Sequence, residues 1–315
     1  MELSHDKFRK NLQNYALTNR FYTAQGEFLF NVWFPPLASK NLIAKRSKRG
    51  RPKTISDEFI RYLFRLKVLF SFGYRQLEGI LKCVISEYNL DVNPISYSQI
   101  CRRVKKLKLN IKPKKTDEEL SIAIDSTGLK IKGQGEWRRI KHIEKYRSGW
   151  IKVHLAVNDK TGEILVVEIT TERKTDASQL LKMMKKLKPF NINQVYADGA
   201  YDQTKCREAI CAAGAVPLIP PRKNARLKKG KNGELVDSYR NDDILYIWEL
   251  GAAAWKQDLG YHRRNLSETA MMRLKHFFSE RLSSISFKMQ KQEVLMRIQI
   301  LNELNAVKLK VAANQ

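Results

Sequence analysis

The spacing of apolar residues along the chain changes near Leu120, and the change predicts two structural regions. Upstream, apolar residues recur at the spacing of amphipathic helices. They predict short helices at Ser56–Phe72, Tyr74–Ile85 and Tyr97–Leu107, with Ser96 as the N-cap of the third. Downstream, alternating positions and short apolar runs predict strands.

The downstream region predicts an α/β domain. Its strands are expected at Ser121–Asp125, Trp150–Asn158, Glu163–Thr170, Gln194–Asp198 and Ala215–Pro220. Asp159–Gly162 is a short turn that makes a hairpin of the second and third. Amphipathic helices are expected at Ala177–Leu187 and Lys205–Ala213. Three strands followed by helix, strand, helix, strand and helix is the order of the ribonuclease-H-like fold, a mixed five-stranded sheet with helices on both faces.

Two long helices are expected near the C-terminal end, Tyr261–Leu282 and Lys288–Val307. The first carries the spacing Y-x2-R-x3-E-x6-K, formed by Tyr261, Arg264, Glu268 and Lys275. At about 100° per residue, these four side chains fall within roughly 60° of one another on an α-helix. A lone Glu on a helix is mostly a solvated surface residue. Glu268 borders the apolar face between two cations, which makes it a candidate for chemistry on a polyanion.

Composition identifies the class of partner but not the reaction. The 315 residues are enough for two domains, and 59 Lys and Arg against 32 Asp and Glu give a net charge of +27. Such an excess predicts a polyanionic partner, with nucleic acid first and a membrane surface second. A hydrophobic content of 43% indicates a folded protein, although ribosomal and other architectural proteins are equally basic.

Several other classes are disfavoured. The four cysteines form no C-x2-C pair and the five histidines are scattered, so a zinc site is not expected. No stretch approaches 18 consecutive apolar residues, and the N-terminus lacks the apolar core of a signal peptide. We therefore expect an intracellular protein outside the membrane.

Two basic segments are candidates for DNA binding. Arg46–Lys53 contains Gly50-Arg51-Pro52, which resembles the minor-groove AT-hook, and Arg51 is the residue that would enter the groove. A basic linker explains this segment equally well. The third predicted helix ends in a basic run that includes Arg102 and Arg103, as a recognition helix of a helix-turn-helix would, although any small helical bundle with a charged face could look the same.

Three carboxylates are candidates for metal binding. Asp125 and Asp198 each follow apolar residues at the end of an expected strand, and the first and fourth strands are neighbours in this fold. Such an aspartate alone is more often a cap or turn-former. Asp202 is the nearest spare carboxylate, and we expect it to be structural. Together with Glu268, Asp125 and Asp198 form a set without His or Cys that suits Mg²⁺, or Mn²⁺ in its place.

The chemistry that this set predicts is two-metal phosphoryl transfer. We expect Asp125 to bridge the two ions, while Asp198 and Glu268 each bind one. Arg264 and Lys275 would grip phosphates, although they could instead pair with Glu268. Tyr261 could contact DNA or pack against the core.

At this point the chain resembles a family. Asp125 in AIDSTGLKI, Asp198 in YADGAYD and the Tyr261–Lys275 spacing are similar to those of bacterial insertion-sequence transposases with a DDE triad, in the IS-five family of the IS-four-like superfamily. VWFPP followed by KRGRPK, FGYRQLEGIL, YSQICRR, IPPRKNA and GYHRRNLSETAMMRLKHFF also resemble that family. The resemblance covers about residues 10–305, and no triad position is substituted.

The resemblance implies a Mg²⁺-dependent transposase. Such an enzyme binds the terminal inverted repeats of double-stranded DNA, cleaves the ends to free 3′-hydroxyls and joins them to target DNA. It would work as a homodimer, in the bacterial cytoplasm and associated with the nucleoid. Residues 1–112 would form a helical DNA-binding region with the GRP segment, and residues 113–315 the catalytic domain with its C-terminal helices.

Two other classes share some of these features. A metal-dependent nuclease of the same fold would cleave without joining strands. A non-catalytic DNA-binding protein could use the same basic surface, but the intact triad argues against it.

Overall fold

The computed structural model describes residues 15–29, 54–111, 113, 116–131, 149–236 and 238–313. The chain divides into two compact units, Ile111–Leu282 and the combination of Met1–Asn110 with Ser283–Gln315. The C-terminal segment thus clusters with the N-terminal helices, and the division at residue 112 into a DNA-binding region and a catalytic domain stays a prediction. Within the described ranges, each helix is too short or too polar to cross a bilayer.

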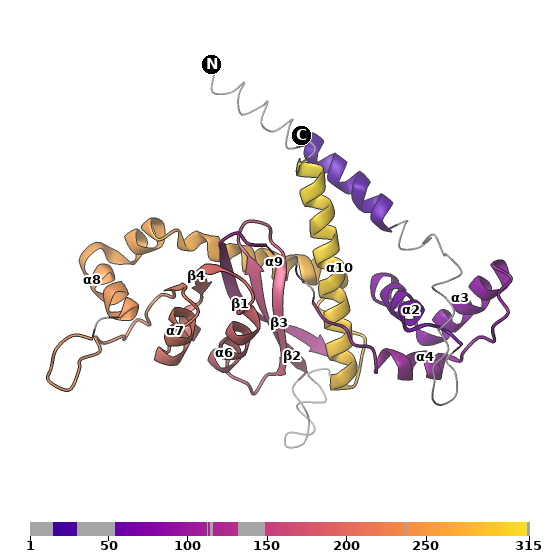
Figure 1. The fold of residues 1–315 in the computed structure, drawn as a ribbon, viewed down its shortest axis with the longest axis horizontal. Helices are drawn as coiled ribbons and strands as arrows, with labels where there is room; N and C mark the ends of the chain where they lie inside the picture. Colours follow the sequence, from indigo (N-terminus) through magenta and orange to yellow (C-terminus); the bar gives the residue numbers. More distant parts are fainter. Residues whose placement is uncertain are drawn as a thin grey trace, which may run out of the picture. The chain divides into compact units, whose positions relative to one another are not determined.

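Helices predominate in the first unit (Figure 1). Helices α2 (Asp57–Phe70), α3 (Tyr74–Glu87) and α4 (Tyr97–Val104) confirm the three predicted helices. Ser96 caps α4 as predicted, because its backbone N–H donates to Gln99 Oε1 and its Oγ accepts from the Gln99 N–H. Nine residues, 88–96, join α3 to α4, which is longer than the turn of a tight helix-turn-helix.

The last helix, α10 (Phe287–Ala313), contacts α2 in this unit. Two of its glutamines donate to backbone carbonyls beyond α4: Gln292 to Leu107 O at 2.7 Å and Gln299 to Asn110 O at 2.8 Å. These long-range bonds assign α10 to the helical unit. Local periodicity cannot reveal them, since the partners lie more than 180 positions apart.

The second unit is built on one mixed sheet. Its strands are β1 (Leu120–Ile131), β2 (Trp150–Asn158), β3 (Ile164–Thr171), β4 (Ile192–Ala197), β5 (Val216–Leu218) and β6 (Arg281–Leu282). The order is β3-β2-β1-β4-β5, with β6 beside β1. The β1–β2 and β2–β3 pairs are antiparallel, and β4 is parallel to both β1 and β5. This confirms the ribonuclease-H-like arrangement, with one strand more than predicted.

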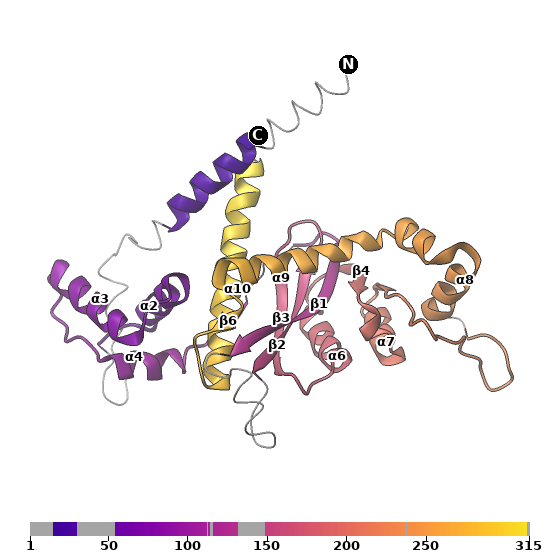
Figure 2. The same cartoon turned by 180° about the vertical axis from the view of Figure 1, so that it is seen from behind.

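Helices cover both faces of the sheet (Figures 1 and 2). Helices α6 (Asp176–Leu187) and α7 (Thr204–Cys211) share a buried core with one face, which includes Ile122 and Ile124 of β1. Helix α9 (Asn265–Phe278) contacts β1 and β2. The other face has its own buried cluster around Ala123, Tyr196 and Leu218.

Two predicted boundaries are wrong. Strand β1 does not end at Asp125 but continues to Ile131, because β2 and β6 still pair with it after β4 has ended. The long helix expected at Tyr261–Leu282 is three elements: the 3₁₀-helix η3 (Tyr261–Arg264), then α9, then β6. Ser279, with φ of 69°, follows the last residue of α9 and redirects the chain into β6.

Helix α8 (Tyr239–Asp258) was not predicted. It contains a break at Gly251, where φ is 86° and ψ is 158°, a backbone conformation that is available essentially only to glycine. The break interrupts the helical phase, so apolar residues of the two halves do not form one continuous stripe. The Tyr246 hydroxyl donates to Asp258 across the break and holds the two halves together.

Replacing Gly251 by Ala should lower the free energy of unfolding by about 1–2 kcal/mol, since a Cβ is strained at this φ although no atom lies within 4 Å of it. Urea denaturation followed by circular dichroism measures the change. The control is Gly79→Ala in the interior of α3, which should stabilise by up to about 1 kcal/mol. Equal effects of the two substitutions would contradict the assignment of a glycine-only break.

Candidate active site

The strand pairing places Asp125 and Asp198 on the same face of the sheet. The β1–β4 ladder aligns Ala123 with Tyr196, both in the cluster opposite α6, and its last pair is Ile124 with Ala197. Because side chains alternate between faces, the next residue of each strand points back to the face of that cluster. Those residues are the two aspartates.

Local backbone bonds fix the orientation of both carboxylates. Asp125 Oδ1 accepts the N–H of Ser126 at 2.7 Å. Asp198 follows the last residue of β4 as predicted and is the N-cap of the 3₁₀-helix η2 (Gly199–Tyr201), where its Oδ1 accepts the N–H of Ala200 at 2.9 Å. The cap role that we considered as the alternative for a strand-end aspartate is therefore present in Asp198, and it leaves Oδ2 for another partner.

Arg264 brings the third carboxylate into the site. Its Nη1 donates to Asp125 Oδ2 at 3.0 Å, and its Nη2 donates to Glu268 Oε1, four residues along the chain. The pairing of Arg264 with Glu268 is the alternative that the sequence left open. One guanidinium thus joins a strand carboxylate to a helix carboxylate.

Burial and the charges at this site shift the pKa of Asp125 and that of Arg264. Burial raises the pKa of Asp125, and the negative charges of Asp198 and Glu268 raise it further, while the Ser126 N–H and the Arg264 guanidinium lower it. Burial works against the charge of Arg264. Its pKa is nevertheless raised, because Tyr261 and the three carboxylates favour the cation. The structure therefore brings all three predicted carboxylates within electrostatic reach of Arg264, and it brings Asp198 and Glu268 within reach of Asp125.

Tyr261 packs rather than pointing outward along the stripe. It lies in η3, outside α9, so the angles of a single α-helix do not apply to it. Its hydroxyl donates to Ala197 O at 3.0 Å, and its ring lies 5.3 Å from that of Trp255. Burial raises its pKa strongly. A DNA contact by Tyr261 stays a prediction.

Among the described residues, the other predicted DNA-binding side chains form no ion pair with the three carboxylates. Lys275 is on α9 and, among the described residues, makes no ion pair within 4.0 Å. Arg102 is exposed on α4, and Arg103 pairs with Asp57. Arg51 lies outside the described residues.

The donor set suits a hard divalent cation, but Arg264 stands in its way. Three carboxylates are the ligands that Mg²⁺ and Mn²⁺ prefer. In the described ranges, no group of three or more His, Cys, Asp and Glu side chains has the arrangement to hold a metal ion. Arg264 is bound to two of the three carboxylates, so a cation could enter only after the guanidinium moves.

The sequence did not predict a buried cluster of ion pairs that follows Asp198 in the fold. Asp202, expected to be structural, accepts from Arg207 and Arg240, and Arg207 also binds Asp243. One signal was present: Arg207 falls on the buried side of an amphipathic helix, beside Cys206 and Ile210. Asp243 gave no signal, because α8 was not predicted.

Replacing Arg264 by Gln should raise the pKa of Asp125, because the nearest cation is removed while Asp198 and Glu268 remain. A carbon-13 NMR titration of the aspartate side chains measures this shift. The matched control is Arg263→Gln, which removes the neighbouring cation that pairs with Asp159 at 3.3 Å and should raise the pKa of Asp159 instead. An unchanged pKa of Asp125 in the Arg264 variant would contradict the described pairing.

Comparison with known proteins now identifies the family. Residues 117–302 match a family model described as a transposase DDE domain, and residues 25–134 match a second model of the same description. A solved synaptic complex of piggyBac transposase with hairpin DNA is 10% identical, with 90% of this chain and 75% of that chain covered and a TM-score of 0.44. The Drosophila P element transposase strand transfer complex is 10% identical, with 89% and 71% covered and a TM-score of 0.34.

A crystal structure of the mariner Mos1 paired end complex with Mg is also similar, with 11% identity, coverage of 78% of this chain and 86% of that chain, and a TM-score of 0.21. Likenesses at this level carry no argument of their own. The first family model alone spans more than half of the sequence. The chain therefore belongs to the transposase DDE domain family.

Proposed function

We propose that this protein binds the terminal inverted repeats of an insertion sequence, cleaves the ends and joins the freed 3′-hydroxyls to target DNA. The observation that carries the proposal is the convergence of Asp125, Asp198 and Glu268 around Arg264. Membership of the DDE family supports it. The IS-five family, a bacterial origin and a homodimer acting on two DNA ends are part of the same proposal.

The three carboxylates are assigned as ligands of two Mg²⁺ ions, with Mn²⁺ as a substitute. When bound, such ions lower the pKa of the attacking water or 3′-hydroxyl and stabilise the leaving oxygen. Asp125 would be suited to bind both, because both other carboxylates act on its pKa and a backbone N–H donates to only one of its oxygens. Asp198 likewise uses one oxygen for its cap and keeps the other.

Arg264 is assigned a second role as a phosphate ligand. Its planar guanidinium binds two carboxylate oxyanions, and a DNA phosphate presents the same kind of acceptor. Arg264 can therefore exchange its carboxylate partners for a phosphate near the cleavage site. Lys275, two turns beyond Glu268 on α9, would bind a phosphate farther along the strand.

Charge supports DNA as the substrate. The net charge is +27, and a loop rich in Lys and Arg, residues 222–231, begins beyond the carboxyl end of β5. Strands β4 and β5 are parallel, so this loop and Asp198 leave the sheet at the same edge. Basic side chains there would neutralise the backbone phosphates of a bound duplex.

Asp125→Asn, Asp198→Asn and Glu268→Gln should each reduce cleavage of a labelled element end by about a thousandfold or more. Binding of the same end should stay within about threefold, because phosphate contacts dominate affinity. The assay detects cleaved and joined products on a gel, with Mg²⁺ and with a chelator. Glu249→Gln, the same change of charge on the exposed side of α8, is the control.

The products separate the three classes of function. Joined DNA supports a transposase, cleaved DNA without joining would leave a nuclease of the same fold, and binding without chemistry would leave a DNA-binding protein. Full cleavage by any of the three carboxylate variants would overturn the assignment of the site.

Arg102→Ala should weaken binding to the terminal repeat by about tenfold and leave binding to unrelated DNA unchanged, since loss of one base contact removes discrimination. Fluorescence anisotropy with both DNAs measures the ratio. Lys82→Ala on α3 is the control, because it removes an exposed cation from the same unit. Unaltered discrimination in the Arg102 variant would mean that α4 is not the recognition helix.

A further inference from the structure

We propose that Asp243, on α8, is a positioning residue for Asp198. The inference rests on the proposed role of Asp198 as a metal ligand. Asp243 touches none of the three site carboxylates. Instead, its two oxygens begin two chains of contacts that reach the backbone on either side of Asp198.

The first chain runs through Arg207. Asp243 Oδ2 accepts from Arg207 Nη1 at 2.7 Å, and Arg207 Nε donates to Asp202 Oδ1 at 3.2 Å. Asp202 is the C-cap of η2, the 3₁₀-helix that Asp198 begins, and its N–H donates to Gly199 O. Arg207 therefore holds the far end of the turn that orients Asp198.

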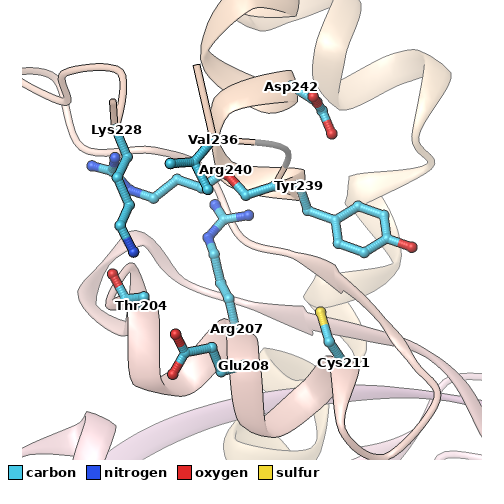
Figure 3. A pocket seen from close by; sticks show the side chains of 10 residues that line it. Thr204, Arg207, Glu208, Cys211, Lys228, Val236, Tyr239, Arg240 and Asp242 are labelled. Atoms are coloured by element: carbon cyan, nitrogen blue, oxygen red, sulfur yellow. The ribbon is translucent and has the colours of Figure 1, made fainter. Parts of the chain in front are cut away.

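The same end of the turn is tied to neighbouring segments. Arg207 Nη2 donates to Ile219 O, just beyond β5, and the backbone N–H of Arg222 donates to Asp202 Oδ2 at 3.2 Å. Arg240 Nε donates to Asp202 Oδ1 at 3.2 Å. Figure 3 shows the Arg207 guanidinium extending from α7 toward Arg240 on α8, in a pocket of about 600 Å³.

The second chain runs through two aromatic rings. Asp243 Oδ1 accepts from Trp255 Nε1 at 2.8 Å, across the break at Gly251. The Trp255 ring packs on Tyr261, whose hydroxyl donates to Ala197 O at 3.0 Å. Ala197 directly precedes Asp198, and Tyr261 begins the 3₁₀-helix that ends at Arg264. This chain therefore links the end of β4 to the segment that carries Arg264.

Burial makes the loss of any of these contacts costly. Asp243 is 7% exposed, Arg207 5% and Trp255 1%. With Asp202 and Arg240, the cluster has two carboxylates and two guanidiniums, so it is neutral. Removing the charge of Asp243 would leave the buried cluster with one uncompensated positive charge and would displace the groups that Asp243 holds. Since Asp243 begins both chains of contacts, its loss should make the backbone more mobile on both sides of Asp198.

The test compares the full-length wild type with Asp243→Asn, Trp255→Phe and a control, Met183→Ala. Asn keeps an acceptor for Trp255 but loses the charge that binds Arg207. Phe keeps an aromatic ring, smaller than the indole, and loses the N–H, and it covers the case in which Asp243→Asn does not fold. Met183 is fully buried in the core between α6 and the sheet, so its truncation destabilises without touching the cluster.

The first readout is amide hydrogen exchange by mass spectrometry. In Asp243→Asn, peptides covering 196–203 and 261–268 should exchange about tenfold faster than in the wild type. In Met183→Ala, the exchange rates of these peptides relative to those of the other sheet peptides should be unchanged. Trp255→Phe should affect 261–268 more than 196–203. Uniform acceleration across the unit in Asp243→Asn and Trp255→Phe would overturn the positioning role, because it would show only lost stability.

The second readout is Mn²⁺ binding by calorimetry, measured on each protein in complex with a DNA end whose phosphate can draw Arg264 away from the carboxylates. Asp243→Asn should bind Mn²⁺ about tenfold more weakly than the wild type, and Met183→Ala should bind it equally well. Equal affinity in Asp243→Asn would also overturn the inference. If the wild type itself bound no Mn²⁺, the proposed metal site would be wrong, and the exchange data would still decide whether Asp243 positions Asp198.

Discussion

Three negative charges at one edge of a sheet need a cation, and this requirement organises the unit that contains the sheet. The parallel pairing of β1 with β4 sets Asp125 and Asp198 side by side, and α9 adds Glu268. Like charges this close destabilise one another and raise the pKa of the most buried one. Arg264 compensates them in the structure, and in the proposed function divalent ions and DNA phosphates would divide that role.

The residues of the Tyr261–Lys275 signature make different kinds of contact. Arg264 and Glu268 meet as an ion pair four residues apart. Tyr261 contacts the backbone beside the site, because its hydroxyl donates to the carbonyl of the residue that precedes Asp198. A change from 3₁₀- to α-helix lies between Tyr261 and Glu268, so the spacing records a fold-specific turn rather than a stripe along one helix. The same spacing therefore contains one packing residue and one charged pair.

Much of the sheet could be predicted because its strands are bounded by local signals. Strand β2 has the predicted limits, and those of β3, β4 and β5 lie within two residues of the predicted ones. The extension of β1 past Asp125 and the short β6 could not be predicted, since both depend on pairing with other segments. Beyond Asp125, β1 pairs with β2, and β6 pairs with the last residues of β1 from about 150 residues away. Helix α8 was hidden because Gly251 divides its periodicity, and α10 finds its partners in the other half of the chain.

The sequence by itself determined the chemical character of this protein. Its charge indicates a polyanionic partner, its strand order indicates the fold, and strand-end and helical patterns read within that fold predict Asp125, Asp198 and Glu268 as candidate metal ligands. Only the tertiary structure decided how these carboxylates are compensated and held. The pairing of Arg264 and the two chains that start at Asp243 join residues far apart in sequence, and contacts of that kind leave no periodic trace because they depend on packing rather than on local backbone preference.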